Sequence, residues 1–164
     1  MRFDKFTTKF QQAVSDAQSL AVGNDQQFIE PQHLLLALLN QDDGSTSSLL
    51  QRAGANVAGL KASLAKALDR LPKVEGHGGE VSIGRDLANL LNVTDKEAQK
   101  AGDQFIASEM FLLALTQSDG KSGGECGRLL KEAGLNRKAL EDAVKAVRGG
   151  ENVGSQDAEG QREG

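Results

Sequence analysis

The strongest constraint on this 164-residue chain is an internal repeat. Residues 28–38 share a pattern with residues 105–115, at a constant offset of 77 positions. The apolar residues of the first stretch return one for one in the second: Phe28, Ile29, Leu35, Leu36, Ala37 and Leu38 return as Phe105, Ile106, Leu112, Leu113, Ala114 and Leu115. Each copy of such a repeat is one supersecondary unit, so we expect two related units packed against each other.

Each copy contains an apolar run that suits a buried helix but is too short for a membrane span. Residues 34–39 and 111–115 are apolar on every face rather than along one stripe. A soluble helix of this kind lies in the middle of a bundle, with neighbours on all sides, whereas a membrane span needs roughly 20 apolar residues. Pro31 and Ser108 precede the two runs and suit the first turn of a helix. We therefore predict two buried central helices and no membrane partner.

Apolar residues at helical spacing flank both central helices and predict the rest of the architecture. In the first copy they predict helices over about residues 5–22, 47–53 and 57–71, and the second copy repeats this order. The prediction is an all-α fold, in which two pseudo-symmetric four-helix repeats pack into one globular eight-helix domain. The first repeat covers residues 1–71, a Gly-rich connector covers 72–82, and the second repeat covers 83–150. Residues 151–164 hold few apolar side chains, so we expect a disordered, flexible tail there.

Composition and charge narrow the classes of partner. The formal net charge is −4, Lys and Arg are scattered among acidic residues, and the chain has no Trp or Tyr. The sequence therefore offers neither a basic cluster nor aromatic stacking platforms, which argues against nucleic acid as a partner. The single cysteine, Cys126, cannot form an internal disulfide, and no apolar signal segment follows Met1. The expected location is the reducing cytoplasm.

No motif in the sequence predicts catalysis or a bound cofactor. Gly120-Lys121-Ser122 matches the end of a phosphate-binding loop, but Leu115 stands where that loop requires a glycine. His33 falls on a central helix and His77 in the connector, and neither has other ligands at metal-binding spacing. Cys126 has no neighbour that would activate its thiol. We expect His33 to be structural, with no metal, cofactor or catalytic residue; an enzyme built from residues distant in sequence stays an alternative.

Several segments together resemble a known family. Both copies contain Leu-Leu-x-x-Ala-Gly, at residues 49–54 and 129–134, and further motifs agree in order and spacing: Phe6-Thr7-Thr8-Lys9-Phe10-Gln11-Gln12-Ala13, Leu71-Pro72-Lys73-Val74-Glu75-Gly76 and Gly102-Asp103-Gln104-Phe105-Ile106. From residue 1 to about 150 the chain resembles the Clp N-terminal repeat family, in particular the N-terminal domains of bacterial ATP-driven disaggregating chaperones. Residues 151–164 resemble the start of a linker to an ATPase module. The loop over residues 119–127 departs from the family pattern, because it is longer and richer in Gly.

The resemblance implies a non-enzymatic substrate-recognition domain. Such a domain binds exposed apolar segments of unfolded or aggregated polypeptides and passes them to an ATPase ring. In the full-length protein the resemblance implies ATP in the ATPase modules, a homohexamer, and cooperation with an Hsp70-type chaperone in the stress response. Three alternatives stay open: an adaptor-docking N-domain of a Clp protease ATPase, an enzyme, and a purely structural cap on a ring.

Two apolar residues fall outside the faces that the predicted core requires. Val93 lies more than about 100° from the centre of its helix's apolar face, and Met110 points away from the apolar run that follows it. Both are candidates for an outer binding spot, although both could instead pack under neighbouring helices. The resemblance favours the binding spot and implies five substrate-binding residues, an apolar patch with polar residues at its margin: Thr7, Val93, Asp103, Glu109 and Met110. Asp103 and Glu109 also have a structural alternative, as acids near a helix N-terminus.

Overall fold

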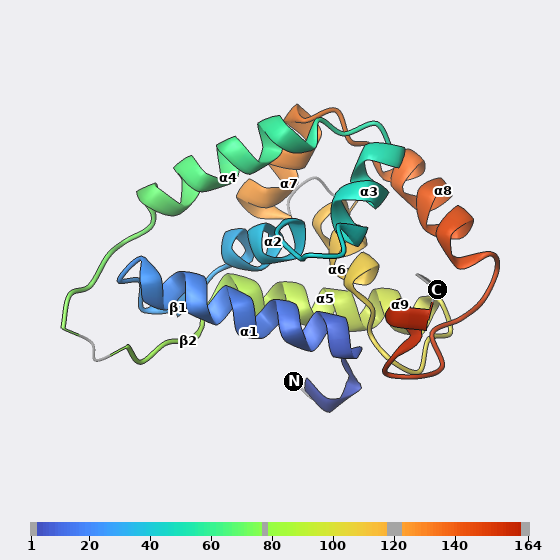
Figure 1. Cartoon of the computed structure of the whole chain (residues 1–164), viewed down its shortest axis with the longest axis horizontal. Helices are drawn as coiled ribbons and strands as arrows, with labels where there is room; N and C mark the ends of the chain where they lie inside the picture. Colours follow the sequence, from blue (N-terminus) through green and yellow to red (C-terminus); the bar gives the residue numbers. More distant parts are fainter. Residues whose placement is uncertain (1–2, 77–78, 118–122, 162–164) are drawn as a thin grey trace.

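The computed structural model describes residues 3–76, 79–117 and 123–161 (Figure 1). Eight α-helices in these ranges correspond to the predicted ones: α1 (Thr8–Gly23), α2 (Pro31–Leu39), α3 (Ser45–Arg52), α4 (Val57–Arg70), α5 (Arg85–Lys100), α6 (Ser108–Leu115), α7 (Gly124–Glu132) and α8 (Arg137–Arg148). The other elements are short: η1 (Phe3–Lys5), β1 (Phe28–Ile29), β2 (Ser82–Ile83) and α9 (Ala158–Gln161). The predicted all-α, eight-helix fold is confirmed.

Polar caps and left-handed glycines set the ends of the outer helices. Asn56 and Asn136 begin α4 and α8, and each side-chain oxygen accepts a hydrogen bond from the backbone N–H three residues later, at 3.1 and 2.8 Å. Gly54 follows α3 and Gly134 follows α7 with φ of +94° and +97°, a region that favours glycine. The repeated Leu-Leu-x-x-Ala-Gly motif is therefore the end of a helix together with the glycine that terminates it.

The central helices α2 and α6 are buried, as the sequence predicts. In Figure 1 they lie between a layer formed by α1 and α5 and an arch formed by α3, α4, α7 and α8. The Phe10 ring of α1 lies 6.1 Å from the Phe111 ring of α6, centroid to centroid, and both rings are fully buried. Every residue of α6 is buried. Within the described ranges, no helix combines the length and apolar character needed to cross a bilayer.

Two parallel backbone pairings join the repeats in a reciprocal way. Ile29 pairs with Ile83 between β1 and β2, and Phe6 pairs with Ile106 in an isolated bridge. At the repeat offset of 77, Phe6 corresponds to Ile83 and Ile29 corresponds to Ile106. The residue that opens each repeat therefore pairs with the residue that precedes the central helix of the other repeat. These pairings escape a sequence-based prediction because two-residue strands carry no periodicity.

The outer helices are also exchanged between the repeats. α3 of the first repeat packs on α8 of the second, and α7 of the second packs on α4 of the first. The backbone N–H of Asn56 donates to the Ala133 carbonyl at 2.8 Å, which ties the start of α4 to the end of α7. Because each repeat completes the other's core, the two form one packed body.

The C-terminal segment differs from the expected disordered tail over residues 151–161. The N–H groups of Gln104 and Thr8 donate to the carbonyls of Val153 and Gln156, both at 2.8 Å, and the Val153 side chain is buried. A short helix, α9, follows. The composition of this segment predicted disorder, because the segment has few apolar side chains. The backbone hydrogen bonds that hold it cannot be inferred from composition. Residues 162–164 lie outside the described ranges, as do His77 and the Gly120-Lys121-Ser122 motif.

Candidate functional site

His33 has a structural role, as predicted. Its Nδ1 accepts a hydrogen bond from the Glu30 backbone N–H at 2.9 Å, and its Nε2 lies 2.6 Å from Gln26 Oε1. The Gln26 amide in turn donates to the Leu68 carbonyl at 2.6 Å, which links α2 to α4. Burial lowers the pKa of His33 to about 4, so the ring is neutral at neutral pH. With both ring nitrogens engaged, His33 is not available to a ligand.

The structure gives no sign of a reactive thiol at Cys126 or of a metal site in the part of the chain that it describes. Cys126 is buried in α7, and burial raises the pKa of its thiol, which disfavours the reactive thiolate. Among the residues that the structure describes, no three His, Cys, Asp or Glu side chains come together in an arrangement that would hold a metal ion.

Val93 and Met110, the two apolar site candidates, differ in exposure. Val93 is partly exposed on α5 and lines a hollow of about 430 Å³ together with Pro31 and Leu90. Met110 is 1% exposed, so its expected place on an outer surface is wrong. Every residue of α6 is buried, so the face of α6 that carries Met110 is covered like the others, and Met110 lines a hollow together with Val144 and Arg148 of α8. For Met110 the alternative reading, packing under a neighbouring helix, is the one that the structure supports.

Asp103 and Glu109 share one cationic partner, Arg148 at the end of α8. The two terminal nitrogens of Arg148 lie 3.0 and 2.8 Å from the Asp103 oxygens, and its Nε lies 2.8 Å from Glu109. All three side chains are nearly inaccessible to solvent. Burial alone would lower the pKa of Arg148, but the bonds to Asp103 and the charge of Glu109 raise it above its ordinary value. A buried bidentate ion pair thus holds the end of α8 against Asp103, and a single charged bond holds it against Glu109 at the start of α6.

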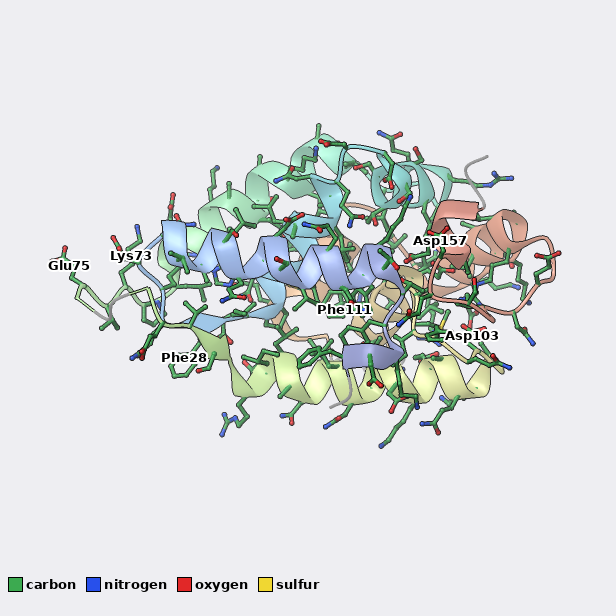
Figure 2. The ribbon with its side chains drawn as sticks, turned by 60° about the horizontal axis from the view of Figure 1, so that its bottom comes forward. Phe28, Lys73, Glu75, Asp103, Phe111 and Asp157 are labelled. Atoms are coloured by element: carbon green, nitrogen blue, oxygen red, sulfur yellow. The ribbon has the colours of Figure 1, made fainter. Side chains whose placement is uncertain are left out.

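Thr7 lies beside the same helix start and contacts a carboxylate from the C-terminal segment. Its hydroxyl accepts a hydrogen bond from Phe10 N–H at 3.2 Å, which caps α1, and it also donates to Glu159. The other oxygen of Glu159 accepts a hydrogen bond from Ser108 N–H at 2.9 Å. Burial, together with the nearby charge of Glu109, raises the pKa of Glu159. Of the five predicted site residues, Thr7, Glu109 and Asp103 are thus linked through Glu159 and Arg148. Figure 2 shows Asp103 towards one end of the molecule.

An apolar groove opens next to these polar residues, between α3 and α8. Its apolar floor comes from α3, α6 and α8, and much of its polar edge comes from the start of α6 and from the C-terminal segment. The lining residues are Ser45, Thr46, Leu49, Ser108, Glu109, Leu112, Val144, Val147 and Glu159. We call this hollow of about 100 Å³ the α3–α8 groove. Val147 is 41% exposed beside it, which leaves an apolar side chain in contact with water. The groove can accept a small apolar side chain, with hydrogen-bonding groups at its rim.

The sequence-based prediction missed two residues of this site, Arg148 and Glu159. Arg148 has the ordinary position of a cation in the last turn of a helix, which hides its tertiary partners. Glu159 falls in the segment that composition assigned to disorder. The two carboxylates that the sequence did identify, Asp103 and Glu109, were the available signal that a buried cation had to lie nearby.

A family model and curated relatives match this chain. The model of the Clp repeat (R) N-terminal domain matches residues 5–133. Chaperone protein ClpB of Pseudomonas putida is 48% identical over 163 residues, which make up 99% of this chain and 19% of that protein. Chaperone protein ClpB of Vibrio cholerae is 47% identical over 159 residues, covering 97% of this chain and 18% of that protein. The chain thus spans less than a fifth of the length of these relatives.

Solved structures share the fold. The Hsp104 N-terminal domain from Candida albicans matches with a TM-score of 0.78 at 21% identity, covering 93% of this chain and 97% of that one. A ClpV N-domain, in a complex with a VipB peptide, matches with a TM-score of 0.70 at 21% identity, covering 87% and 86%. Identities this low establish the fold alone, but the family model covers most of the chain and the ClpB relatives are close in sequence. The chain belongs to the Clp repeat N-terminal domain family.

Proposed function

We propose that this domain recognises exposed apolar segments of unfolded or aggregated polypeptides and, within a longer protein, passes them to an ATPase ring. The observation that carries the proposal is the α3–α8 groove, where an exposed valine and an apolar floor lie beside Thr7, Asp103 and Glu109. The likeness to ClpB supports a role in a chaperone, and the solved complex of a ClpV N-domain with a peptide supports polypeptide as the ligand of such a fold.

The dimensions of the groove suit weak and unselective capture. A hollow of about 100 Å³ accommodates one small side chain, so little apolar area is buried per contact. After the cost of ordering a flexible client is subtracted, the net affinity for any one segment is low. Weak binding lets the domain accept many sequences and release them, which a domain that feeds a motor requires.

The remaining roles are proposed from the likeness to ClpB. We place ATP binding in modules outside this chain, in a homohexameric protein of the cytoplasm that works with an Hsp70-type chaperone. The domain itself is proposed to have no catalytic activity. Docking of one folded adaptor protein is the second candidate function, because a ClpV N-domain, which shares this fold, has been solved in complex with a peptide of one particular protein, VipB.

The test is the affinity for a permanently unfolded protein, reduced and carboxymethylated α-lactalbumin, measured by fluorescence anisotropy. Val147→Asp should weaken binding about tenfold, because an apolar contact worth roughly 1.5 kcal/mol or more is replaced by a charge. Val22→Asp is the matched control, because Val22 is 38% exposed and, like Val147, is the second-last residue of its helix. The C-terminal end of that helix, α1, lies far from α8 in Figure 1. It should leave affinity unchanged.

Val93→Asp tests the other apolar candidate in the same assay. A comparable loss with Val93→Asp would extend the client site to the hollow beside α5. Equal affinity of Val147→Asp and wild type would rule out the α3–α8 groove. Failure of wild type to bind the unfolded protein, together with capture of one folded adaptor, would favour the adaptor-docking function.

A further inference from the structure

The two central helices begin with carboxylates that come from different places. In the first repeat, Glu30 directly precedes α2 and forms a capping box with His33. At the repeat offset of 77, Ala107 stands in the place of Glu30, and it offers no side-chain cap to α6. A helix N-terminus with unpaired N–H groups favours a negative charge. The second repeat therefore lacks the internal carboxylate that the first repeat contains.

Glu159 of the C-terminal segment fills this place in the second repeat. One of its oxygens accepts the Ser108 N–H at 2.9 Å, and the other accepts the hydroxyl of Thr7. At the same offset, Thr7 of the first repeat corresponds to Gly84 of the second repeat. A Cβ atom on Gly84 would collide with the Glu30 carboxylate. The residue that faces each carboxylate differs accordingly. Glycine faces Glu30, which directly precedes its own helix, and the hydroxyl donor Thr7 faces Glu159, which comes from the C-terminal segment.

Two further features show that this place is built to receive a ligand group. The Ser108 side chain is 5% exposed, and its Oγ lies by the Glu159 carboxylate without a hydrogen bond of good geometry to it or to any other described residue. Ser108 and Glu159 also line the α3–α8 groove, so the carboxylate and the apolar floor belong to one continuous surface. Glu109, the nearest competing negative charge, is paired with Arg148.

The segment that carries Glu159 is held mainly by hydrogen bonds and buries little apolar surface. α9 is four residues long, and Val153 is the one buried apolar side chain described between residues 151 and 159. The rest is held by polar contacts. The backbone N–H groups of Thr8, Gln104 and Phe105 donate to carbonyls of the segment, the Val153 N–H donates to Asp103, and the Gln156 amide donates to the Asp4 carbonyl. A segment with so little buried apolar surface opens at low free energy.

We propose that the Thr7 hydroxyl and the start of α6 form a carboxylate-binding site, that Glu159 occupies it as a competitor within the chain, and that clients displace Glu159 with an acidic side chain. The preferred client segment then carries an acidic residue next to the apolar residue that enters the α3–α8 groove. This inference rests on the proposed function for its client, while the carboxylate site itself stands on the contacts above.

The carboxylate site is tested first on the full chain by NMR. Glu159→Ala should shift the Ser108 amide resonance, and an added peptide with the sequence of residues 152–161 should restore it. The same peptide with Gln in place of Glu159 should bind at least about tenfold more weakly, because a charge-assisted bond is lost. Thr7→Val should weaken the peptide, while Thr7→Ser, which keeps both the cap of α1 and the hydroxyl, should not.

The competition is tested with carboxymethylated α-lactalbumin. Glu159→Ala should raise its affinity roughly three- to tenfold, because removal of the internal competitor increases the fraction of open sites. Asp157→Ala is the matched control, since Asp157 is an exposed acid two residues away on the same segment (Figure 2), and it should change nothing.

The outcomes separate the two proposals. If Glu159→Ala leaves both the Ser108 resonance and the client affinity unchanged, the carboxylate site is overturned, even where Val147→Asp still weakens the client. If the peptide binds at Ser108 but no unfolded protein binds any variant, the carboxylate site is upheld and the client function is overturned. If Asp157→Ala acts like Glu159→Ala, general repulsion by the tail replaces the specific competitor.

Discussion

At the scale of single residues, the charged side chains beside the groove are already ion-paired with one another. Asp103, Glu109 and Arg148 form a buried ion-pair group. Loss of Arg148 takes the shared cation from two buried carboxylates, and loss of either carboxylate breaks one of the two buried pairs. Breaking a buried pair typically costs about 3–5 kcal/mol of stability. A binding defect after replacement of Asp103 or Glu109 would therefore not separate recognition from folding. Val147→Asp, and Thr7→Val compared with Thr7→Ser, are the cleaner probes, because they leave these charges paired and the serine keeps the cap of α1.

The buried histidine predicts a pH dependence of stability. The pKa of His33 is about 4 in the folded chain against an ordinary value of 6.5. Since the unfolded chain takes up a proton that the folded chain refuses, stability should fall as pH drops from about 7 towards 4. The loss due to His33 should be about 2 kcal/mol at pH 5, measured by urea unfolding at pH 7.5 and 5.0.

Two variants isolate the contribution of His33. His33→Gln should lose this part of the pH dependence, whereas His77→Gln, which replaces the chain's other histidine, should keep it. The raised pKa values of Glu30 and Glu159 act in the opposite direction, because the folded chain then binds protons more readily as pH falls. The comparison between variants is therefore decisive, and equal pH dependence in wild type and His33→Gln would contradict the account.

At the scale of elements, the repeats are joined by close backbone approaches as well as by side chains. The start of each repeat pairs with the segment before the other's central helix, and the outer helices are exchanged. A further close backbone approach lies within the second repeat, where α7 passes the end of α6, and a glycine permits it. A Cβ atom on Gly127 would lie 2.7 Å from the Leu115 carbonyl oxygen.

This approach predicts the effect of a single methyl group. Gly127→Ala should lower the free energy of unfolding by about 1–3 kcal/mol, because the backbone of α6 or α7 has to move. Gly23→Ala, at the end of α1 with no heavy atom in reach of the new methyl, should stay within about 0.5 kcal/mol of wild type. Urea unfolding measures both, and equal stability of Gly127→Ala and wild type would show that the helices separate without cost.

The sequence predicted the elements better than the contacts between them. The repeat offset and the apolar runs located α2 and α6, and Asn56 and Asn136 correctly marked the starts of α4 and α8, because these signals are local. The reciprocal strand pairs were missed because residues far apart in the chain form them. Met110 was misplaced for the same reason, since α6 is buried among other elements on all its faces.

The candidate site was predicted only in part. Thr7, Asp103 and Glu109 do come together, but the resemblance to the family indicated them, not periodicity. Arg148 and Glu159 become recognisable only when the ends of α8 and of the C-terminal segment meet at the start of α6. Charge in a helix's last turn and an acid in a polar tail are ordinary features of surfaces, so neither carried a signal.

At the scale of the whole molecule, the proposed client surface lies at one end of a single packed body. The α3–α8 groove, the ion-pair group and the C-terminal segment meet there, whereas Phe28, Lys73 and Glu75 mark the opposite end in Figure 2. Because the repeats complete each other's cores, the groove is built jointly by helices of both repeats. The proposed recognition therefore requires the assembled domain and not one repeat alone.

The most direct test of this account is an NMR titration of the full chain with carboxymethylated α-lactalbumin. The account predicts chemical-shift changes that cluster on α3, the start of α6 and the end of α8, and that Val147→Asp removes while Val22→Asp preserves. No shifts at millimolar client concentration would contradict the client-binding function. Shifts confined to the hollow beside Val93 would contradict the placement of the site in the α3–α8 groove.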